Sequence, residues 1–340
     1  MGNITNNNKI VLLKLGAVVT IITACLFFSC NSNKKSHTDI HSLFLAGNDL
    51  YAAGSVCDGS STTDIPTLWK NGVAQEIGRQ GNFNSATSVF VSGDDVYVTI
   101  REDYKASLWK NGERQTLGDC DANCVYVDNN QNVYVAGQLD DKPVLWKNSK
   151  VRTLGETGEA EYVLVKGDSV YVTGIFGNSF HGDAFLCIIS NDGENDTTID
   201  LGMSNANSIF ITKTGDIYVA GGVASGAALW KNGEVEELWD CDNRSYKNNS
   251  GQSVAVNNDG KVVVAGIIFD SGLTCTAAIW VDGICHNVSD IMSYQAMSVV
   301  TDGEVFYIGG CSTDGKWSVW EYDGKSDFNL KQLKRVPAKK

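Results

Sequence analysis

Proline and positive charge are both scarce in this chain of 340 residues. It has 3 prolines and 35 glycines, a balance that suits many tight turns between hydrogen-bonded strands. Lys and Arg number 27 against 40 Asp and Glu, and the formal net charge of −13 argues against a nucleic-acid partner, because phosphate binding needs a basic stripe. The basic C-terminal tail, 332–340, is interpreted as a solvated end.

Recognisable catalytic motifs are also missing. The chain has 4 His, and it contains no H-E-x-x-H pair, nucleophile elbow, phosphate-binding loop or zinc-ligand spacing. Asp and Asn recur between the predicted strands, where they act as turn formers. The sequence therefore predicts no catalytic residue, no metal site and no cofactor.

The hydrophobic segment near the N-terminus is too short to cross a bilayer comfortably. It runs from Leu15 to Phe28, whereas a spanning helix needs roughly 20 residues. Lys9 and Lys14 precede it and the small Ser29 follows it, as in a secretory signal. We therefore interpret residues 1–29 as a signal peptide and expect the chain to be exported.

The cysteine that follows this segment, Cys30, resembles the lipidated cysteine of the bacterial lipoprotein lipobox. The resemblance implies that Cys30 carries the lipid and that residues 30–40 form a polar tether. Phe27 stands where a branched residue is usual, and Cys25 is the alternative site. Cleavage at Cys25 would leave the apolar residues 26–28 at the mature start, so Cys30 is preferred. We expect a monomer, anchored to the outer membrane in the cell envelope of a Gram-negative-type bacterium.

One phrase, LWKNG, stands at residues 68–72, 108–112 and 229–233, and variants stand at 145–149, 279–283 and 319–324. Their tryptophans are spaced by about 42 residues once a missing copy is allowed between Trp146 and Trp230, and this period is typical of propeller blades. Seven units result, and they begin near His41, Asn84, Ala122, Ala160, Ser204, Gly251 and Tyr294.

Each unit has the same four segments in the same order. A short apolar strand comes first, then a turn and a strand that ends in Gly, then a strand with the Trp, and finally an Asn-Gly turn and a short strand. Asn-Gly is a preferred hairpin pair because both of its residues accept positive φ. The pattern predicts an all-β, seven-bladed β-propeller of four-stranded antiparallel blades over residues 41–331, with an open solenoid as the alternative.

The Trp of each unit lies in its third strand, where a large flat side chain can fill the wedge between neighbouring blades. Equivalent copies at the blade period favour packing over sugar stacking. The unit resembles the HAF-type extracellular repeats of bacteria and, more distantly, kelch repeats. This resemblance implies an exported repeat protein and transfers no functional residue to this chain.

Most of the 10 cysteines follow Cys30, and an exported compartment permits disulfides. Spacing alone leaves many pairings open. Cys120 and Cys124 are a local candidate pair. Cys57 and Cys311 both follow the second strand of their units, the first and the last, and a closed ring would make these units neighbours. We therefore predict a Cys57–Cys311 staple.

Two functions fit this sequence. We favour a non-enzymatic binding or scaffold lipoprotein whose propeller recognises glycan or protein. The alternative is a propeller-type polysaccharide hydrolase or lyase, which needs His, Tyr, Arg or carboxylate side chains that converge on one face.

Loop lengths indicate one working face. The first and third connections of each unit are short turns, except at 190–198, whereas the other two connections vary in length. In an up-and-down blade the variable connections emerge on the same face, and binding residues tend to lie on such loops. The alternative is that these loops merely tolerate insertion. The candidate ligand-binding residues are Arg101, Tyr104, Phe180, His181, Arg244, Tyr246 and Phe269.

Overall fold

The computed structural model describes residues 36–57, 63–177, 182–190, 196–242, 249–269, 275–288, 294–312, 318–325 and 328–333. Within these residues, every regular element is a β-strand, from β1 to β28. No helix in the described part of the chain is long and apolar enough to cross a membrane. The predicted all-β class is confirmed.

The strands fall into consecutive groups of four, named here groups I to VII. Group I comprises β1 (His37–Ala46), β2 (Asp49–Cys57), β3 (Ile65–Lys70) and β4 (Val73–Glu76). Group II comprises β5 (Ser85–Ser92), β6 (Asp95–Glu102), β7 (Lys105–Lys110) and β8 (Glu113–Gly118). Group III comprises β9 (Cys120–Val127), β10 (Val133–Leu139), β11 (Lys142–Lys147) and β12 (Lys150–Thr153). Group IV comprises β13 (Gly158–Lys166), β14 (Ser169–Phe176), β15 (Asp183–Ser190) and β16 (Thr197–Asp200).

The remaining groups repeat this order. Group V comprises β17 (Asn205–Ile211), β18 (Ile217–Val223), β19 (Gly226–Lys231) and β20 (Glu234–Leu238). Group VI comprises β21 (Ser250–Val256), β22 (Val262–Phe269), β23 (Cys275–Val281) and β24 (Ile284–Asn287). Group VII comprises β25 (Ala296–Thr301), β26 (Phe306–Ser312), β27 (Val319–Tyr322) and β28 (Lys331–Gln332).

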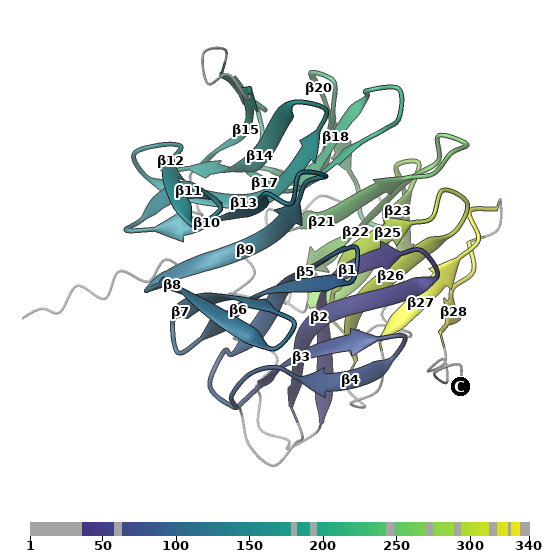
Figure 1. The fold of residues 1–340 in the computed structure, drawn as a ribbon. Helices are drawn as coiled ribbons and strands as arrows, with labels where there is room; N and C mark the ends of the chain where they lie inside the picture. Colours follow the sequence, from purple (N-terminus) through teal and green to yellow (C-terminus); the bar gives the residue numbers. More distant parts are fainter. Residues whose placement is uncertain are drawn as a thin grey trace, which may run out of the picture.

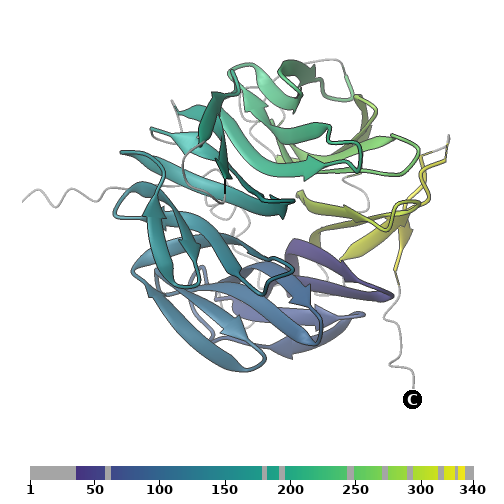
Figure 2. The ribbon, with the colours of Figure 1, turned by 45° about the horizontal axis from the view of Figure 1, so that its top comes forward.

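Each group is an antiparallel sheet in chain order, and groups I and VII are joined because the start of β1 also pairs with the end of β26. Figures 1 and 2 show the sheets around a common centre, with the first strand of each group inside. The four-stranded unit is therefore confirmed. The first sheet begins at His37, so residues 37–40, expected in the tether, belong to the fold.

Apolar side chains fill the spaces between consecutive groups. One buried cluster lies at each of the six junctions from I–II to VI–VII, and a further one joins Val319 of group VII to Ile40 and Leu43 of group I. The repeated tryptophans lie in the third strands, between 0% and 6% exposed, and each packs towards the preceding group. The packing interpretation of the Trp is confirmed.

Group IV lacks this Trp, and Cys187 takes its place in the register. Cys187 lies opposite Val172, as Trp146 lies opposite Val135 in group III. The smaller side chain is compensated by Phe185, which stacks on Phe176 at a centroid distance of 4.2 Å in the same cluster.

The Lys-Asn part of LWKNG ties the third strand back to the start of the second. In group I, Asn71 has a φ of 52° and accepts a 2.9 Å hydrogen bond from Leu50 N–H, while its amide donates to Asp49. Lys70 Nζ lies 2.8 Å from Asp49 and 5.1 Å from the centre of the Tyr51 ring. Asn111, Asn148 and Asn232 repeat the Asn contacts, so the phrase is architectural.

Every first strand has a β-bulge near its start, shown by a one-residue shift in its pairing with the second strand. The bulge brings a first-strand carbonyl onto the glycine that ends the repeated motif of the second strand. A Cβ on Gly137 would lie 2.0 Å from Asp121 O, and one on Gly54 would lie 1.8 Å from Asp39 O. A Cβ on Gly174, Gly221 or Gly266 would collide with a first-strand carbonyl oxygen in the same way. Gly is therefore required at this position, because the first-strand carbonyl lies too close to leave room for a Cβ atom.

A serine just after the bulge joins neighbouring groups at the centre. Ser298 of group VII accepts a 3.0 Å hydrogen bond from Leu43 N–H of group I, across 255 residues of sequence. Equivalent bonds join groups I–II, II–III, V–VI and VI–VII through Ser42, Ser88, Ser208 and Ser253.

The cysteines pair differently from the predictions. Cys241 and Cys285, with Cα atoms 5.0 Å apart, form a disulfide that joins the end of group V to β24. Cys120 and Cys124 are separate thiols four residues apart on β9, about 13 Å along an extended strand, whereas a disulfide needs Cα atoms within about 7 Å. The predicted local pair is wrong. Burial raises the pKa of both thiols to about 11, which leaves them unreactive.

The predicted Cys57–Cys311 staple is also wrong, although the closure of the ring that motivated it places the two residues in one sheet. Cys57 pairs with His37 and Cys311 pairs with Asp39, so β1 lies between them. Two strand spacings of about 4.8 Å separate the residues, with a further offset along β1, and this distance exceeds what a disulfide spans.

Removing the hydroxyl of Ser298 should weaken the junction between groups VII and I. In Ser298→Ala the buried Leu43 N–H loses its partner, and we expect the free energy of unfolding to fall by about 1–3 kcal/mol. Chemical denaturation of the purified protein measures it. Thr153→Ala, on an exposed outer strand, is the control and should change stability by less than about 0.5 kcal/mol. Equal stability of both variants would show that this bond does not secure the junction.

Candidate functional site in the central channel

A channel of about 460 Å³ lies at the centre of the molecule. Residues from the first strand of every group line it, so its wall is built from β1, β5, β9, β13, β17, β21 and β25. These strands surround the centre in Figure 2. A cavity of this size suits a small ligand.

The bulged residues of the first strands all line this channel. A bulge re-aims a side chain, and here it does so at one level in every group. The first strands begin at the end where the variable connections emerge, so this level lies near the predicted working face. The residues, named here the bulge ring, are His41, Thr87, Asn123, Glu161, Asn207, Gln252 and Met297.

Several members of the bulge ring bond forward to the next group. His41 Nδ1 lies 2.7 Å from Ser85 Oγ, and Thr87 donates to the carbonyl of Ala122 at 2.6 Å. The Asn123 amide donates to Glu159 Oε1 at 2.8 Å, and Asn207 donates to the carbonyl of Gly251 at 2.8 Å. These bonds fix the orientation of the ring on the sides of groups I to III and V.

Other polar groups at this level are buried without a partner in the described part of the chain. The Gln252 side chain is 6% exposed in all, and its Nε2 has no hydrogen-bond partner. Gln295 Oε1 and Arg101 Nε are also buried without a hydrogen-bond partner among the described residues. A buried donor without a partner costs about 1–3 kcal/mol, so such atoms mark places where a ligand or water can bind.

Charged groups meet on the side of groups I to IV. Arg101 Nη1 lies 3.7 Å from Asp121, and burial together with Asp121 raises the pKa of Glu159 to about 7. Burial, with Glu159 close by, also raises the pKa of Glu161, whereas burial lowers that of His41. At neutral pH this wall therefore presents a protonated carboxyl, a neutral imidazole and a guanidinium paired with a carboxylate.

Aromatic side chains lie further along the first strands, past the bulge ring. Phe44 and Phe90 have ring centroids 4.5 Å apart, and Phe90 and Tyr126 have centroids 4.6 Å apart. We name these three residues the aromatic arc. The channel therefore combines polar hydrogen-bonding groups with flat apolar faces, all from rigid strands.

The structure separates the predicted binding residues. Arg101 lines the channel, and Phe269 packs with Met297 of the bulge ring. Tyr104 is 77% exposed in the turn after β6 and does not line the channel. Phe180, His181, Arg244 and Tyr246, like Cys30, lie outside the described residues.

Sequence reasoning missed the bulge ring, although a signal for it exists. A small residue, the bulged residue and a Ser stand together in SATS at 85–88, NANS at 205–208, SGQS at 250–253 and QAMS at 295–298. Group IV has EAEY at 159–162 instead. Aligning the units on this motif, rather than on the Trp, would have identified the ring.

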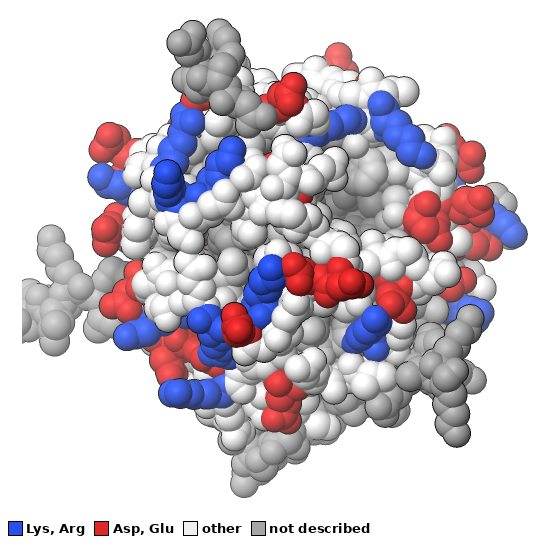
Figure 3. All heavy atoms as spheres, viewed as in Figure 1, with Lys and Arg blue, Asp and Glu red and all other residues white. Residues whose placement is uncertain are grey.

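The outer surface shows no single-sign patch on the face seen in Figure 3, where Lys and Arg alternate with Asp and Glu. Mixed charge of this kind is ordinary for a soluble surface and steers no polyanion to this face. The channel is therefore the more informative feature.

No protein-family model matches this chain, and no curated protein resembles it in sequence. Solved structures resemble it in fold. A puromycin-hydrolyzing peptidase of Mycobacterium tuberculosis superposes with a TM-score of 0.59 at 10% identity, over 94% of this chain and 55% of that chain. The Dos1 propeller superposes with a TM-score of 0.56 at 12% identity, over 90% of this chain and 86% of that chain.

A third neighbour is the extracellular domain described for a hybrid two component system of B. thetaiotaomicron. It superposes with a TM-score of 0.52 at 11% identity, over 83% of this chain and 38% of that chain. This chain thus spans only part of the peptidase and of this extracellular domain. At these identities the likeness shows the fold alone, an all-β architecture of the β-propeller class.

The raised pKa of Glu159 should be visible in the pH dependence of stability. Its pKa is about 7 in the folded state and about 4.5 in the unfolded state. Its contribution to the free energy of unfolding is therefore complete below about pH 4.5 and is lost as the pH rises through 7. Glu159→Gln keeps the oxygen that accepts from Asn123 and removes the titration. Between about pH 5 and 8 the variant should lose about 1–3 kcal/mol less unfolding free energy than the parent.

Urea unfolding at several pH values measures this difference. Glu113→Gln, at an exposed position on β8, is the matched control and should follow the parent. An identical pH profile for Glu159→Gln and the parent would refute the assignment of a proton to this carboxyl at neutral pH.

Proposed function

We propose that this protein is an exported lipoprotein whose seven-bladed β-propeller binds a carbohydrate in its central channel. Seven groups of four strands and the apolar clusters at successive junctions, including VII–I, support the blade number. The observation that carries the binding role is the bulge ring, in which the buried Gln252 Nε2 has no hydrogen-bond partner among the described residues.

The chemistry of the channel wall favours a neutral, hydroxyl-rich ligand. Amides and a protonated carboxyl both donate and accept hydrogen bonds, which matches sugar hydroxyls. The aromatic arc offers flat apolar faces for the C–H side of a sugar ring, and the channel volume fits one or a few such rings. A protein ligand would instead bind on the variable connections outside the channel.

A second function, hydrolysis or elimination on a polysaccharide, has one specific observation in its favour. His41, Arg101 and Glu161 line the channel, and Glu159 lies close enough to Arg101 and Glu161 for their charges to interact. A carboxyl with a pKa near 7 can act as a general acid or base at physiological pH. These groups support the enzyme alternative as a second candidate.

A glycan panel with product analysis should separate the two functions. For a bound glycan, Gln252→Leu should weaken affinity at least about tenfold, because the Nε2 donor is lost. Glu113→Gln should leave affinity unchanged. New reducing or unsaturated ends that disappear in Glu161→Gln would favour the enzyme, whereas intact glycan would favour the binding module. Equal affinity in Gln252→Leu would place the ligand outside the channel, and binding of a protein but no glycan would reject the carbohydrate.

The proposal also includes a lipid anchor at Cys30 and a site in the cell envelope. The apolar segment before Cys30 and the polar residues after it support this anchor, and a HAF-type repeat would suit an exported protein. We expect Cys30→Ala to move the protein from the membrane fraction to the soluble fraction, or to leave it unprocessed. Cys25→Ala should have no such effect. A mature, membrane-bound Cys30→Ala variant would reject lipidation at this residue.

A further inference from the structure

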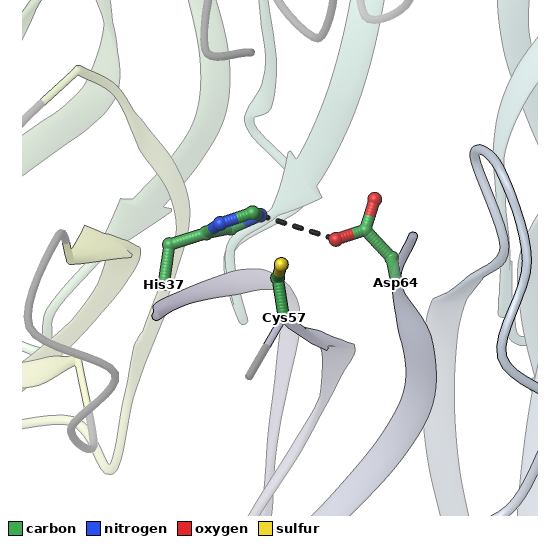
Figure 4. A group of neighbouring side chains, drawn as sticks. All are labelled: His37, Cys57 and Asp64. Carbon is green, nitrogen blue, oxygen red and sulfur yellow. Dashed lines mark ion pairs between the residues drawn. The ribbon is translucent and has the colours of Figure 1, made fainter. Parts of the chain in front are cut away.

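A cluster of three possible metal ligands lies at the start of β1. His37, Cys57 and Asp64 each place a ligand atom within 4.8 Å of the others (Figure 4). They come from three segments, because His37 opens β1, Cys57 ends β2 and Asp64 precedes β3. Their sequence spacing matches no metal motif, so only the fold brings them together.

The backbone holds all three residues in place. His37 and Cys57 are directly paired across β1 and β2. Asp64 N–H donates to Gly81 O at 2.9 Å, and Gly81 N–H donates to Asp64 O at 3.0 Å. Cys57 is 3% exposed and Asp64 is 9% exposed. Ligand atoms that are buried and fixed in this way need little reorganisation to bind a cation.

The position of the Asp64 carboxylate indicates that a ligand of this group is missing. Its Oδ1 lies 3.1 Å from His37 Nε2, as Figure 4 shows, yet it is buried without a hydrogen-bond partner among the described residues. Asp39 Oδ2 lies 3.7 Å from the same nitrogen, and Asp39 is 5% exposed. Ligand atoms on a tetrahedral zinc ion are about 3 to 4 Å apart, because zinc–ligand distances are about 2.0–2.3 Å. The His37–Asp64 separation fits one coordination sphere, whereas Asp39 lies outside the group of three whose ligand atoms are all within 4.8 Å of one another.

We propose that His37, Cys57 and Asp64 bind a borderline divalent cation, with Zn²⁺ as the preferred ion. A nitrogen, a sulfur and an oxygen together suit zinc, whereas calcium and magnesium prefer oxygen alone. The imidazole, the thiolate and the carboxylate each donate a lone pair, and the thiol proton is released to solvent on binding. Three protein ligands leave the fourth position of the tetrahedron to a water molecule.

Such a site would stabilise the start of β1, the first strand of the described fold. It would clamp the start of β1 to β2 and to the segment before β3, next to the residues of β1 that pair with β26. This site does not depend on the carbohydrate or on the channel.

The test is metal binding by the purified full-length protein after removal of metal with a chelator. Zn²⁺ is titrated in competition with a chromophoric chelator, and Co²⁺ is then used as a spectroscopic probe. We expect one equivalent of metal, a thiolate-to-cobalt charge-transfer band and the d–d bands of tetrahedral cobalt. Cys57→Ser should abolish the charge-transfer band, and Asp64→Asn should weaken Zn²⁺ binding at least about tenfold.

Cys187→Ser, which removes a buried thiol in group IV, is the matched control and should bind as the parent does. Circular dichroism shows whether each variant folds. If Cys57→Ser does not fold, zinc-edge X-ray absorption of the parent decides, with one sulfur neighbour expected. No stoichiometric metal in the parent, an unchanged band in Cys57→Ser, or a zinc ion without a sulfur neighbour would overturn the proposal.

Discussion

The close approach of a first-strand carbonyl to a second-strand glycine is the contact on which the rest of this fold depends. The bulge that produces it lets each inner strand bend towards the centre, and a Cβ at Gly54 or Gly137 would collide with the carbonyl. This contact fixes the positions of three residues: the residue before the bulge, the bulged residue and the residue that follows it. One local distortion therefore explains the Gly in the second strand of groups I, III, IV, V and VI, whereas group II has Ile100 at this position.

The same distortion builds both the ring and the candidate site. The Ser after the bulge accepts a backbone N–H from the next group, while the bulged residue itself turns to the channel. Group IV departs from this scheme, since it has Tyr162 in place of Ser, Cys187 in place of Trp, and Glu159 and Glu161 where other groups have smaller or neutral side chains. The group that departs from the repeated packing contributes two carboxyl groups with raised pKa values, as expected where a site is superimposed on a scaffold.

The sequence contained most of the fold and little of the site. Strand order, the Asn-Gly hairpins and the buried Trp follow from period, turn chemistry and hydrophobic pattern, which are local. The channel wall is not local, because Asn123 meets Glu159 only when two units lie side by side. Loop length drew attention to Tyr104, which is exposed, and away from Gln252, which lies within a strand and looks like an ordinary polar residue. Cysteine pairing failed for the same reason, since β1 separates Cys57 from Cys311.

Closure of the ring follows from where the first strand begins. A propeller can share one blade between its two ends, but here groups I and VII each take their four strands from one continuous stretch. The junction is therefore held by side chains, by the Leu43–Ser298 bond and by the short pairing of β1 with β26. Because a lipid tether on Cys30 would enter the fold at His37, any pull on the tether reaches this junction first. A metal clamp at His37 would add a side-chain constraint at the end of β1 that pairs with both β2 and β26.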